Sequence, residues 1–192
     1  MRINHKTGLA IAAGMLAMAV GAARIHAAVT VASTDVPKTI NDLVTVTSTL
    51  NFTVNGTITD ANLLLNIRHT WDGDVGISLT RPGGAAVSLW NNANGNCGGS
   101  GDNFTNTVLN DQGVAPNCLN TGAPYTGNFQ GAPGGIVNPT VMGGFNTFAS
   151  GGVWTLSIFD DVGADTGTLL GWSLTLDGPP PLPVELMKLE VK

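Results

Sequence analysis

The stretch that decides the fold is residues 153–176, VWTLSIFDDVGADTGTLLGWSLTL. Apolar side chains alternate with other residues in both of its halves, at Trp154, Leu156, Ile158, Leu170, Trp172, Leu174 and Leu176. A period of two places every second side chain on the same face of a β-strand, so each half predicts a strand with one buried face. Residues 160–167 between them are rich in Asp and Gly, which favour a turn.

The same alternation appears upstream of this stretch. We expect further strands, because β-branched and other apolar residues recur at alternate positions and turn signals separate the runs, at 44–54, 58–70, 75–79 and 87–90. Leu64 interrupts the alternation, which indicates that its strand is covered on both faces. Residues 91–152 are dense in Gly, Asn, Pro and Thr, and there we expect short strands, at 108–109 and at Val141, between ordered loops.

No segment has a sustained helical period, so we expect one domain of short antiparallel strands over residues 40–177. The alternating buried faces require a second sheet to cover them. We therefore predict an all-β fold, a jelly-roll-like antiparallel β-sandwich with Trp90, Trp154 and Trp172 in its core. Trp71 falls in a turn and is the tryptophan expected at the surface.

Composition agrees with this fold class and excludes others. The chain has 192 residues, a formal net charge of −5 and 11% charged residues, against about 25% in an average soluble domain. No cluster of Lys and Arg is large enough to hold nucleic acid by its phosphates. The 43% hydrophobic content excludes intrinsic disorder, and the 26 glycines follow no three-residue period, which excludes a collagen.

Residues 1–27 have the pattern of a signal peptide. Arg2 and Lys6 precede an apolar, alanine-rich run, and small residues follow that run near position 27. The alternative is a membrane anchor, but the run is shorter than the roughly 20 residues that span a bilayer. We therefore expect a secreted, extracellular protein of bacterial type with no transmembrane segment after the signal is removed.

The two cysteines, Cys97 and Cys118, both follow the predicted signal. In an oxidising compartment an even pair favours a disulfide. The alternative is a metal-binding pair, for which the cysteines are far apart and short of histidine partners. We expect residues 28–39 and 178–192 to flank the domain as a leader and a proline-rich tail.

Five short stretches occur in order along the chain: HTWDGDV at 69–75, LTRPGG at 79–84, DNF at 102–104, GVWTL at 152–156, and a last stretch from Asp160 through DTG at 165–167 to Trp172. Together they resemble the signature of the P domain, also called the P/Homo B domain. The resemblance runs from about residue 40 to 177.

Membership of that family implies a β-sandwich similar to galactose-binding-like folds. P domains usually follow the catalytic domain of kexin-like, furin-like and bacterial subtilisin-type proteases, whose folding and stability they support, and some are implicated in substrate binding. In this chain no catalytic domain precedes the resembling region. The resemblance also gives His69, Trp71, Trp154 and Trp172 structural roles.

The residues themselves argue against an enzyme. A subtilisin-type triad needs a serine nucleophile, a histidine base and an aspartate, and His69 is the one histidine after the predicted signal. It is followed by Trp71 and two aspartates, and no serine occupies a G-x-S-x-G elbow. We therefore expect no catalytic residues and no protease activity of the chain's own.

Calcium is the cofactor that the sequence suggests. Its candidate ligands are aspartates gathered in turns, namely Asp72, Asp74, Asp102, Asp111, Asp160, Asp161 and Asp165. Carboxylate and carbonyl oxygens are the ligands that Ca²⁺ prefers, and some P domains are calcium-binding. The alternative is that these side chains stabilise turns by bonding to nearby backbone.

Two classes of function follow from this reasoning. The first is an accessory domain that acts with a subtilisin-like protease on another chain, by stabilising the protease or by binding its protein substrate. The second is a free-standing extracellular binding or adhesion module that uses the loops at one end of the sandwich. The sequence names no ligand for either.

Overall fold

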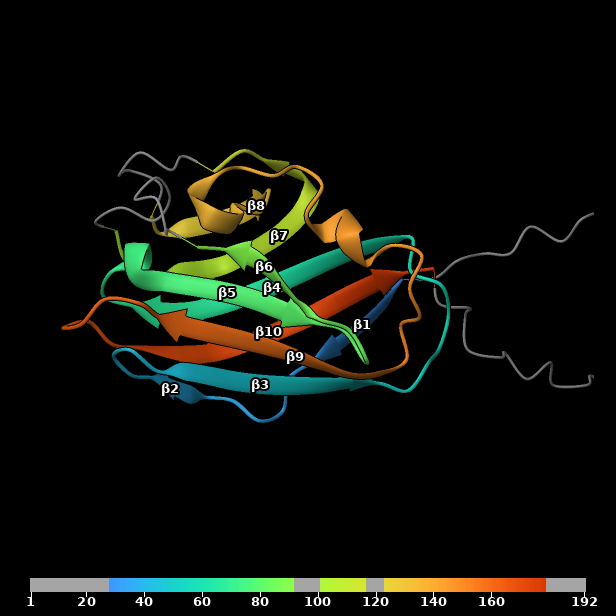
Figure 1. Cartoon of the computed structure of the whole chain (residues 1–192), viewed down its shortest axis with the longest axis horizontal. Coiled ribbons are helices and arrows are strands. Elements are labelled where there is room, and N and C mark those ends of the chain that lie inside the picture. Colours follow the sequence, from blue (N-terminus) through green and yellow to red (C-terminus); the bar gives the residue numbers. More distant parts are fainter. Residues whose placement is uncertain (1–27, 92–100, 117–122, 179–192) are drawn as a thin grey trace, which may run out of the picture.

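The computed structural model describes residues 28–91, 101–116 and 123–178 (Figure 1). The predicted signal peptide, Cys97, Cys118 and residues 179–192 lie outside the described residues. The described residues form ten strands, namely β1 Val29–Ala32, β2 Lys38–Ile40, β3 Thr45–Phe52, β4 Asp60–His69, β5 Val75–Thr80, β6 Ala86–Trp90, β7 Phe104–Val114, β8 Tyr125–Phe129, β9 Gly152–Asp160 and β10 Gly167–Asp177. Three short 3₁₀ turns accompany them, namely η1 Asp72–Asp74, η2 Pro133–Gly135 and η3 Met142–Phe145.

The strands form two sheets that pack face to face (Figure 1). One has six strands in the order β1-β10-β4-β7-β8, with β2 also pairing with β10, and the other has four in the order β3-β9-β5-β6. The predicted all-β sandwich is therefore confirmed, and the described residues contain no α-helix. None of those residues forms a helix long and apolar enough to cross a membrane.

Burial follows the period of two. In β3 the buried side chains are Ser48, Leu50 and Phe52, and in β9 they are Trp154, Leu156, Ile158 and Asp160. Trp90 and Trp154 are fully buried, Trp172 is 3% exposed, and Trp71 is 41% exposed. All four tryptophans therefore lie where the sequence places them.

The sheet is not purely antiparallel, which corrects one expectation. β7 and β8 pair in parallel, because the connection after Val114 returns the chain to the end of the sheet where β7 begins. Tyr125 lies opposite Phe104, the first residue of β7, and its backbone N–H donates to the carbonyl of Asn103 at 3.1 Å.

Two positions differ from the expected strand pattern. Leu170 is 50% exposed, because a bulge between Leu169 and Gly171 shifts the register of β10 against β4 and turns Leu169 inward instead. Val141 is in a turn and not in a strand. The residues after Val141 bond to a side chain instead of a neighbouring strand: the N–H groups of Met142 and Gly143 donate to the Asp111 carboxylate.

The segment expected as a leader, residues 28–39, contributes directly to the larger sheet. β1 pairs with β10 from Val29↔Leu176 to Ala32↔Ser173, and β2 pairs with the start of the same strand. Val29 and Val31 pack against the core. Four residues are too few for the alternation of β1 to stand out in the sequence.

Candidate functional site

Strand register brings the motif residues together at one end of the sandwich. In the larger sheet His69, the last residue of β4, lies opposite Gly167, the first residue of β10. In the smaller sheet Val75, the first residue of β5, lies opposite Asp160, the last residue of β9. The connections 70–74 and 161–166 therefore meet at this end, which lies at the left of Figure 1.

His69 joins the two sheets at this end. Its Nε2 atom lies 3.2 Å from Oδ2 of Asp160, its Nδ1 atom lies 2.9 Å from the carbonyl oxygen of Trp71, and both His69 and Asp160 are buried. The backbone N–H of His69 donates to Oδ1 of Asn103 at 3.1 Å. Three of the five motif stretches thus meet at this one residue.

This packing requires a glycine at position 167, the last residue of the DTG stretch. A Cβ at Gly167 would collide with the imidazole ring of His69 and with the carbonyl oxygen of Arg68. Glycine is the residue that lets one strand approach another this closely. The pairing of β10 with β4 beside a buried histidine therefore depends on a residue without a side chain.

Further hydrogen bonds tie the loops together. The Thr70 hydroxyl donates to Oδ1 of Asp165 at 2.6 Å, and the Asp161 N–H donates to the carbonyl of Asp74 at 2.9 Å. The Ala164 N–H donates to Oδ2 of Asp42 at 3.1 Å. We call the three connected segments 41–44, 70–74 and 161–166 the tip.

Asp72 is the most unusual group of the tip. Its side chain is fully buried, and neither of its carboxylate oxygens has a hydrogen-bonding partner among the described residues. Its pKa is raised to about 8, mainly by burial and in part by the charge of Asp102, while the Asn103 backbone N–H opposes the shift. That N–H lies close to the carboxyl group without the geometry of a full hydrogen bond.

Asp74 also has a raised pKa. Burial raises its pKa to about 6, and the neighbouring charges of Asp160, Asp165 and Asp161 act in the same direction, while His69 opposes them. Burial and the charge of Asp160 also raise the pKa of Asp161. Carboxyl groups packed together in this way favour the protonated form.

The seven aspartates proposed as calcium ligands do not all converge. Asp111 lies on β7, where its carboxylate accepts from the N–H groups of Met142 at 2.9 Å and Gly143 at 2.6 Å. Asp160 is held by His69, and Asp165 by Thr70. Within the described ranges no group of three or more His, Cys, Asp or Glu side chains is arranged to hold a metal ion.

A single site built from all seven carboxylates therefore does not fit this geometry. The part that comes nearest to fitting is Asp72 with Asp102, because Asp72 has two oxygens without donors and the two carboxyl groups feel each other's charge. Calcium binding stays a prediction of the sequence.

The tip also exposes apolar side chains, most of which the sequence analysis did not single out. The exposed fractions are 61% for Leu43, 49% for Val44, 41% for Trp71 and 52% for Val162. The tip segments contain five aspartates and no lysine or arginine. Val162 lies within the turn expected at 160–167. Val44 was expected on the buried side of a strand beginning at 44, but β3 begins at Thr45 and Val44 is exposed, and no pattern singled out Leu43.

The geometry does not fit His69 to a catalytic triad. A catalytic histidine holds its aspartate with one ring nitrogen and faces a serine hydroxyl with the other. Here the second nitrogen faces the backbone of Trp71, and the side chain has no exposed surface. The Asp–His pair is part of the packing between the two sheets.

Comparisons with known proteins give limited help. No family model matches the chain, and no curated protein matches it. The similar solved structures include a complex of the Aeromonas sobria serine protease with the chaperone ORF2 (15% identity, 80% of this chain and 27% of that chain, TM-score 0.43) and the serine protease of Aeromonas sobria (16% identity, 79% and 27%, TM-score 0.43). This chain thus spans about a quarter of each, and at this level of similarity no function is transferred.

Proposed function

We propose that the chain is an exported, non-catalytic P domain that binds a subtilisin-like serine protease, or that protease's protein substrate, through the tip. The observation that carries the proposal is the meeting of the motif stretches around His69. Residues 69–75, 102–104 and 160–167, which carry much of the P-domain resemblance, are bonded to one another there.

The surface chemistry of the tip suits a protein partner. Exposed apolar patches that are bordered by polar groups are typical of protein interaction sites, and tryptophan is enriched among residues that dominate binding energy. Trp71 is held in place because its neighbours on both sides, Thr70 and Asp72, are bonded to other segments. The three tip aspartates that are not buried, Asp42, Asp161 and Asp165, predict a partner surface that carries positive charge.

The role assigned to His69 supports an accessory function over an enzymatic one. Both of its ring nitrogens face protein groups, so the side chain is used in joining the sheets. We propose that the chain's effect on proteolysis is exerted through another chain, by stabilising that chain or by holding its substrate.

The test uses residues 28–192, purified after export and immobilised, to capture proteins from the culture medium of the source organism. A subtilisin-like protease, identified by mass spectrometry and then purified, should bind with a measurable Kd and should inactivate more slowly on heating when the chain is present. Trp71→Ala should weaken that binding at least tenfold.

Val162, just after the end of β9, and Val153, near its start, supply a matched pair for this test. Val162 is 52% exposed at the tip, and Val153 is 54% exposed at the far end of the strand. Val162→Asp should weaken binding, and Val153→Asp should leave it unchanged. Equal effects of the two variants, or retention on cell wall with no protease captured, would contradict the proposal and favour the adhesion alternative.

A further inference from the structure

The outer face of the four-stranded sheet carries an array of hydroxyl groups. Register places Thr47, Ser157, Ser78 and Ser88 in one row across the four strands, and Thr49, Thr155 and Thr80 in the next row. Thr45 begins a third row, opposite Phe159, which lies opposite Gly76. Neighbouring strands are about 4.8 Å apart and alternate residues about 6.7 Å apart, so the hydroxyls form a regular lattice.

None of these hydroxyl groups donates or accepts a hydrogen bond within the part of the chain that the structure describes. The hydroxyl residues on the two central strands, such as Ser157 and Ser78, are half-buried. The four on the edge strands, Thr45, Thr47, Thr49 and Ser88, are exposed. All are therefore available to water or to a ligand.

The face also lacks charge. The remaining outward positions hold Asn51, Val153, Phe159, Gly76 and Ala86, so no outward residue of the four strands is charged. Protein surfaces usually carry about 25–35% charged residues.

The outer face of the larger sheet differs, because it carries charged residues and its polar side chains are hydrogen-bonded. There Asp60 and Arg68 lie on β4, and the polar side chains bond to one another. Asp60 accepts from Asn62 at 2.7 Å and from Gln112 at 3.2 Å, and Thr30 bonds to Thr175 at 2.8 Å. The uncharged, unbonded hydroxyl lattice is a property of the smaller sheet alone.

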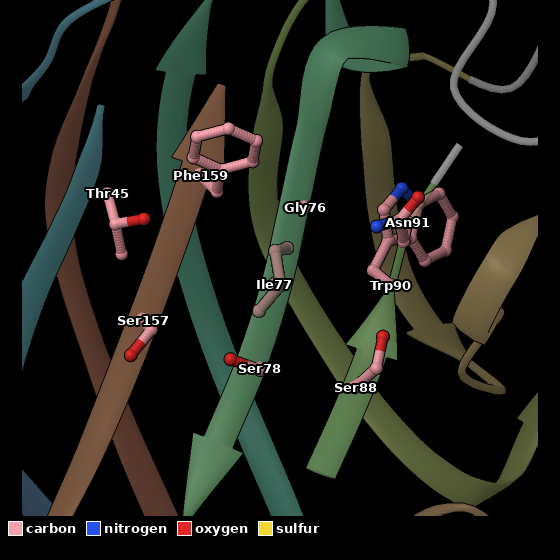
Figure 2. A pocket seen from close by; sticks show the side chains of 9 residues that line it. All are labelled: Thr45, Gly76, Ile77, Ser78, Ser88, Trp90, Asn91, Ser157 and Phe159. Atoms are coloured by element: carbon pink, nitrogen blue, oxygen red, sulfur yellow. The ribbon is translucent and has the colours of Figure 1, made fainter. Parts of the chain in front are cut away.

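A hollow of about 270 Å³ opens on this face, lined by residues of all four strands and by Asn91. Figure 2 shows Ser157, Ser78 and Ser88 on three neighbouring strands, with Phe159 and Asn91 on opposite sides of Gly76. Gly76 forms the floor, and the Phe159 side chain is 38% exposed. The space exists because Gly76 has no side chain. A Cβ at position 76 would fit without a clash, at ordinary contact distances of 3.6 Å from Asn91 Nδ2 and from the Phe159 carbonyl oxygen.

We infer that this face binds a neutral polysaccharide chain, with one sugar ring seated over Gly76 beside Phe159. Each serine or threonine hydroxyl donates one hydrogen bond and accepts two, as sugar hydroxyls do. The Phe159 ring offers an apolar surface to the C–H groups of a sugar. A few neutral polar groups around an aromatic surface are what orient a small ligand in a protein pocket.

Other ligand classes fit this lining less well. An anionic or cationic ligand would meet no countercharge on the face and would lose its hydration. A purely apolar ligand would bury hydroxyl groups without partners, which costs free energy for each group. The hollow lies on the flat of the sheet and adjoins the tip, because Thr45 follows Val44 and Phe159 lies two residues before Asp161.

The test is titration of ¹⁵N-labelled residues 28–192 with neutral oligosaccharides of four kinds, derived from cellulose, chitin, starch and galactan, and with anionic alginate oligosaccharides. At least one neutral series should shift the amide signals of residues 76–78, 88 and 157–159. Ser157→Glu should weaken that binding at least tenfold. Ser173→Glu is the control, because Ser173 is also half-buried but lies on the outer face of the larger sheet.

Gly76→Ala separates binding from folding. It removes a flexible residue from a strand, so its Tm should equal or exceed that of the unchanged protein, while its added methyl group fills the hollow and weakens binding. The inference is overturned by shifts with alginate alone, by no shifts with any neutral series at 20 mM, or by equal binding of the two glutamate variants. Shifts at these residues that depend only on protein concentration would overturn it too, since they would identify a second copy of the chain as the occupant.

Discussion

At the scale of single residues, the tip and the residues that border it contain ionisable side chains whose burial is unfavourable unless they have partners. His69 and Asp160 compensate each other across the two sheets, whereas Asp72 is buried with no such partner. The same few residues therefore contribute a stabilising contact and a destabilising one. Their consequences can be measured separately, because the first depends on a partner and the second on pH.

Replacing His69 should cost stability and change no enzymatic activity. His69→Ala leaves the Asp160 carboxylate buried without its partner, and breaking a buried pair in this way costs about 3–5 kcal/mol. Urea unfolding measures that loss. The double variant His69→Ala, Asp160→Asn should recover part of it, since the unpaired charge is gone. Casein hydrolysis by the wild-type chain that disappears in His69→Ala would contradict the structural role.

Asp72 predicts a stability that falls as pH rises. Its pKa is about 8 in the folded protein against 3.8 for an ordinary aspartate, so between these values the folded state holds a proton that the unfolded state has lost. The folded state therefore loses relative stability with each step up in pH through that window. Asp74, with a pKa of about 6, adds to the effect at its lower end.

The variant Asp72→Asn should remove this dependence. We expect its Tm to exceed that of the wild type by several degrees more at pH 9 than at pH 5, since about 1 kcal/mol corresponds to roughly 2–4 °C at this size. Thermal melts of both proteins across this pH range make the comparison. An equal difference at the two pH values would show that ionisation of the Asp72 carboxyl group does not destabilise the folded protein.

At the scale of elements, the long segment 130–150 is held to the strands by isolated backbone bonds and by side chains, without forming a long strand of its own. Asp111 on β7 binds the backbone at the start of η3, and Ser150 accepts a hydrogen bond from the Gly56 N–H at 2.9 Å and donates one to the Val54 carbonyl at 3.0 Å. These bonds let Met142 and Phe145 lie buried in the core without belonging to a sheet.

Replacing Asp111 tests this attachment. Asp111→Ala leaves two backbone N–H groups without an acceptor, which should cost about 3–6 kcal/mol, because hydrogen bonds to charged groups contribute about 1.5–3 kcal/mol each. Asp111→Asn keeps one acceptor and should lose less. Amide hydrogen exchange at Met142 and Gly143 should quicken in the same order, and unchanged exchange in the alanine variant would contradict the role.

At the scale of the whole molecule, the sandwich presents two different working surfaces. The tip combines exposed apolar side chains with acidic groups, and the outer face of the smaller sheet carries hydroxyls without charge. The two surfaces adjoin each other where Thr45 and Phe159 border the tip. One rigid scaffold therefore supports both the proposed protein partner and the inferred polysaccharide.

Calcium can be tested on the intact domain. We expect millimolar Ca²⁺ to raise the Tm by several degrees over a chelator, because an ion that binds only the folded state stabilises it. Asp72→Asn should reduce this rise in Tm. Asp111→Asn should keep it, although the variant is less stable overall, because the Asp111 carboxylate is already engaged by the backbone at the start of η3. An unchanged melt of the wild type in Ca²⁺ would end the calcium hypothesis.

Local pattern was sufficient for much of the fold and for part of the site. Alternation at positions such as Leu156 and Leu174 depends only on the geometry of a strand, so it predicted the strands, their buried faces and the core tryptophans. It failed at Leu170, where a bulge changes the phase, and at Val141, where a side chain of another strand supplies the hydrogen bonds.

By itself the sequence determined the fold class, the buried tryptophans and the exposure of Trp71, because these follow from side-chain period and turn chemistry within a few residues. Only the tertiary structure decided which aspartates meet, that His69 pairs with Asp160, and that hydroxyls from four separate strands form one uncharged face. Those features depend on strand register between segments far apart in the chain, and no local pattern specifies that register.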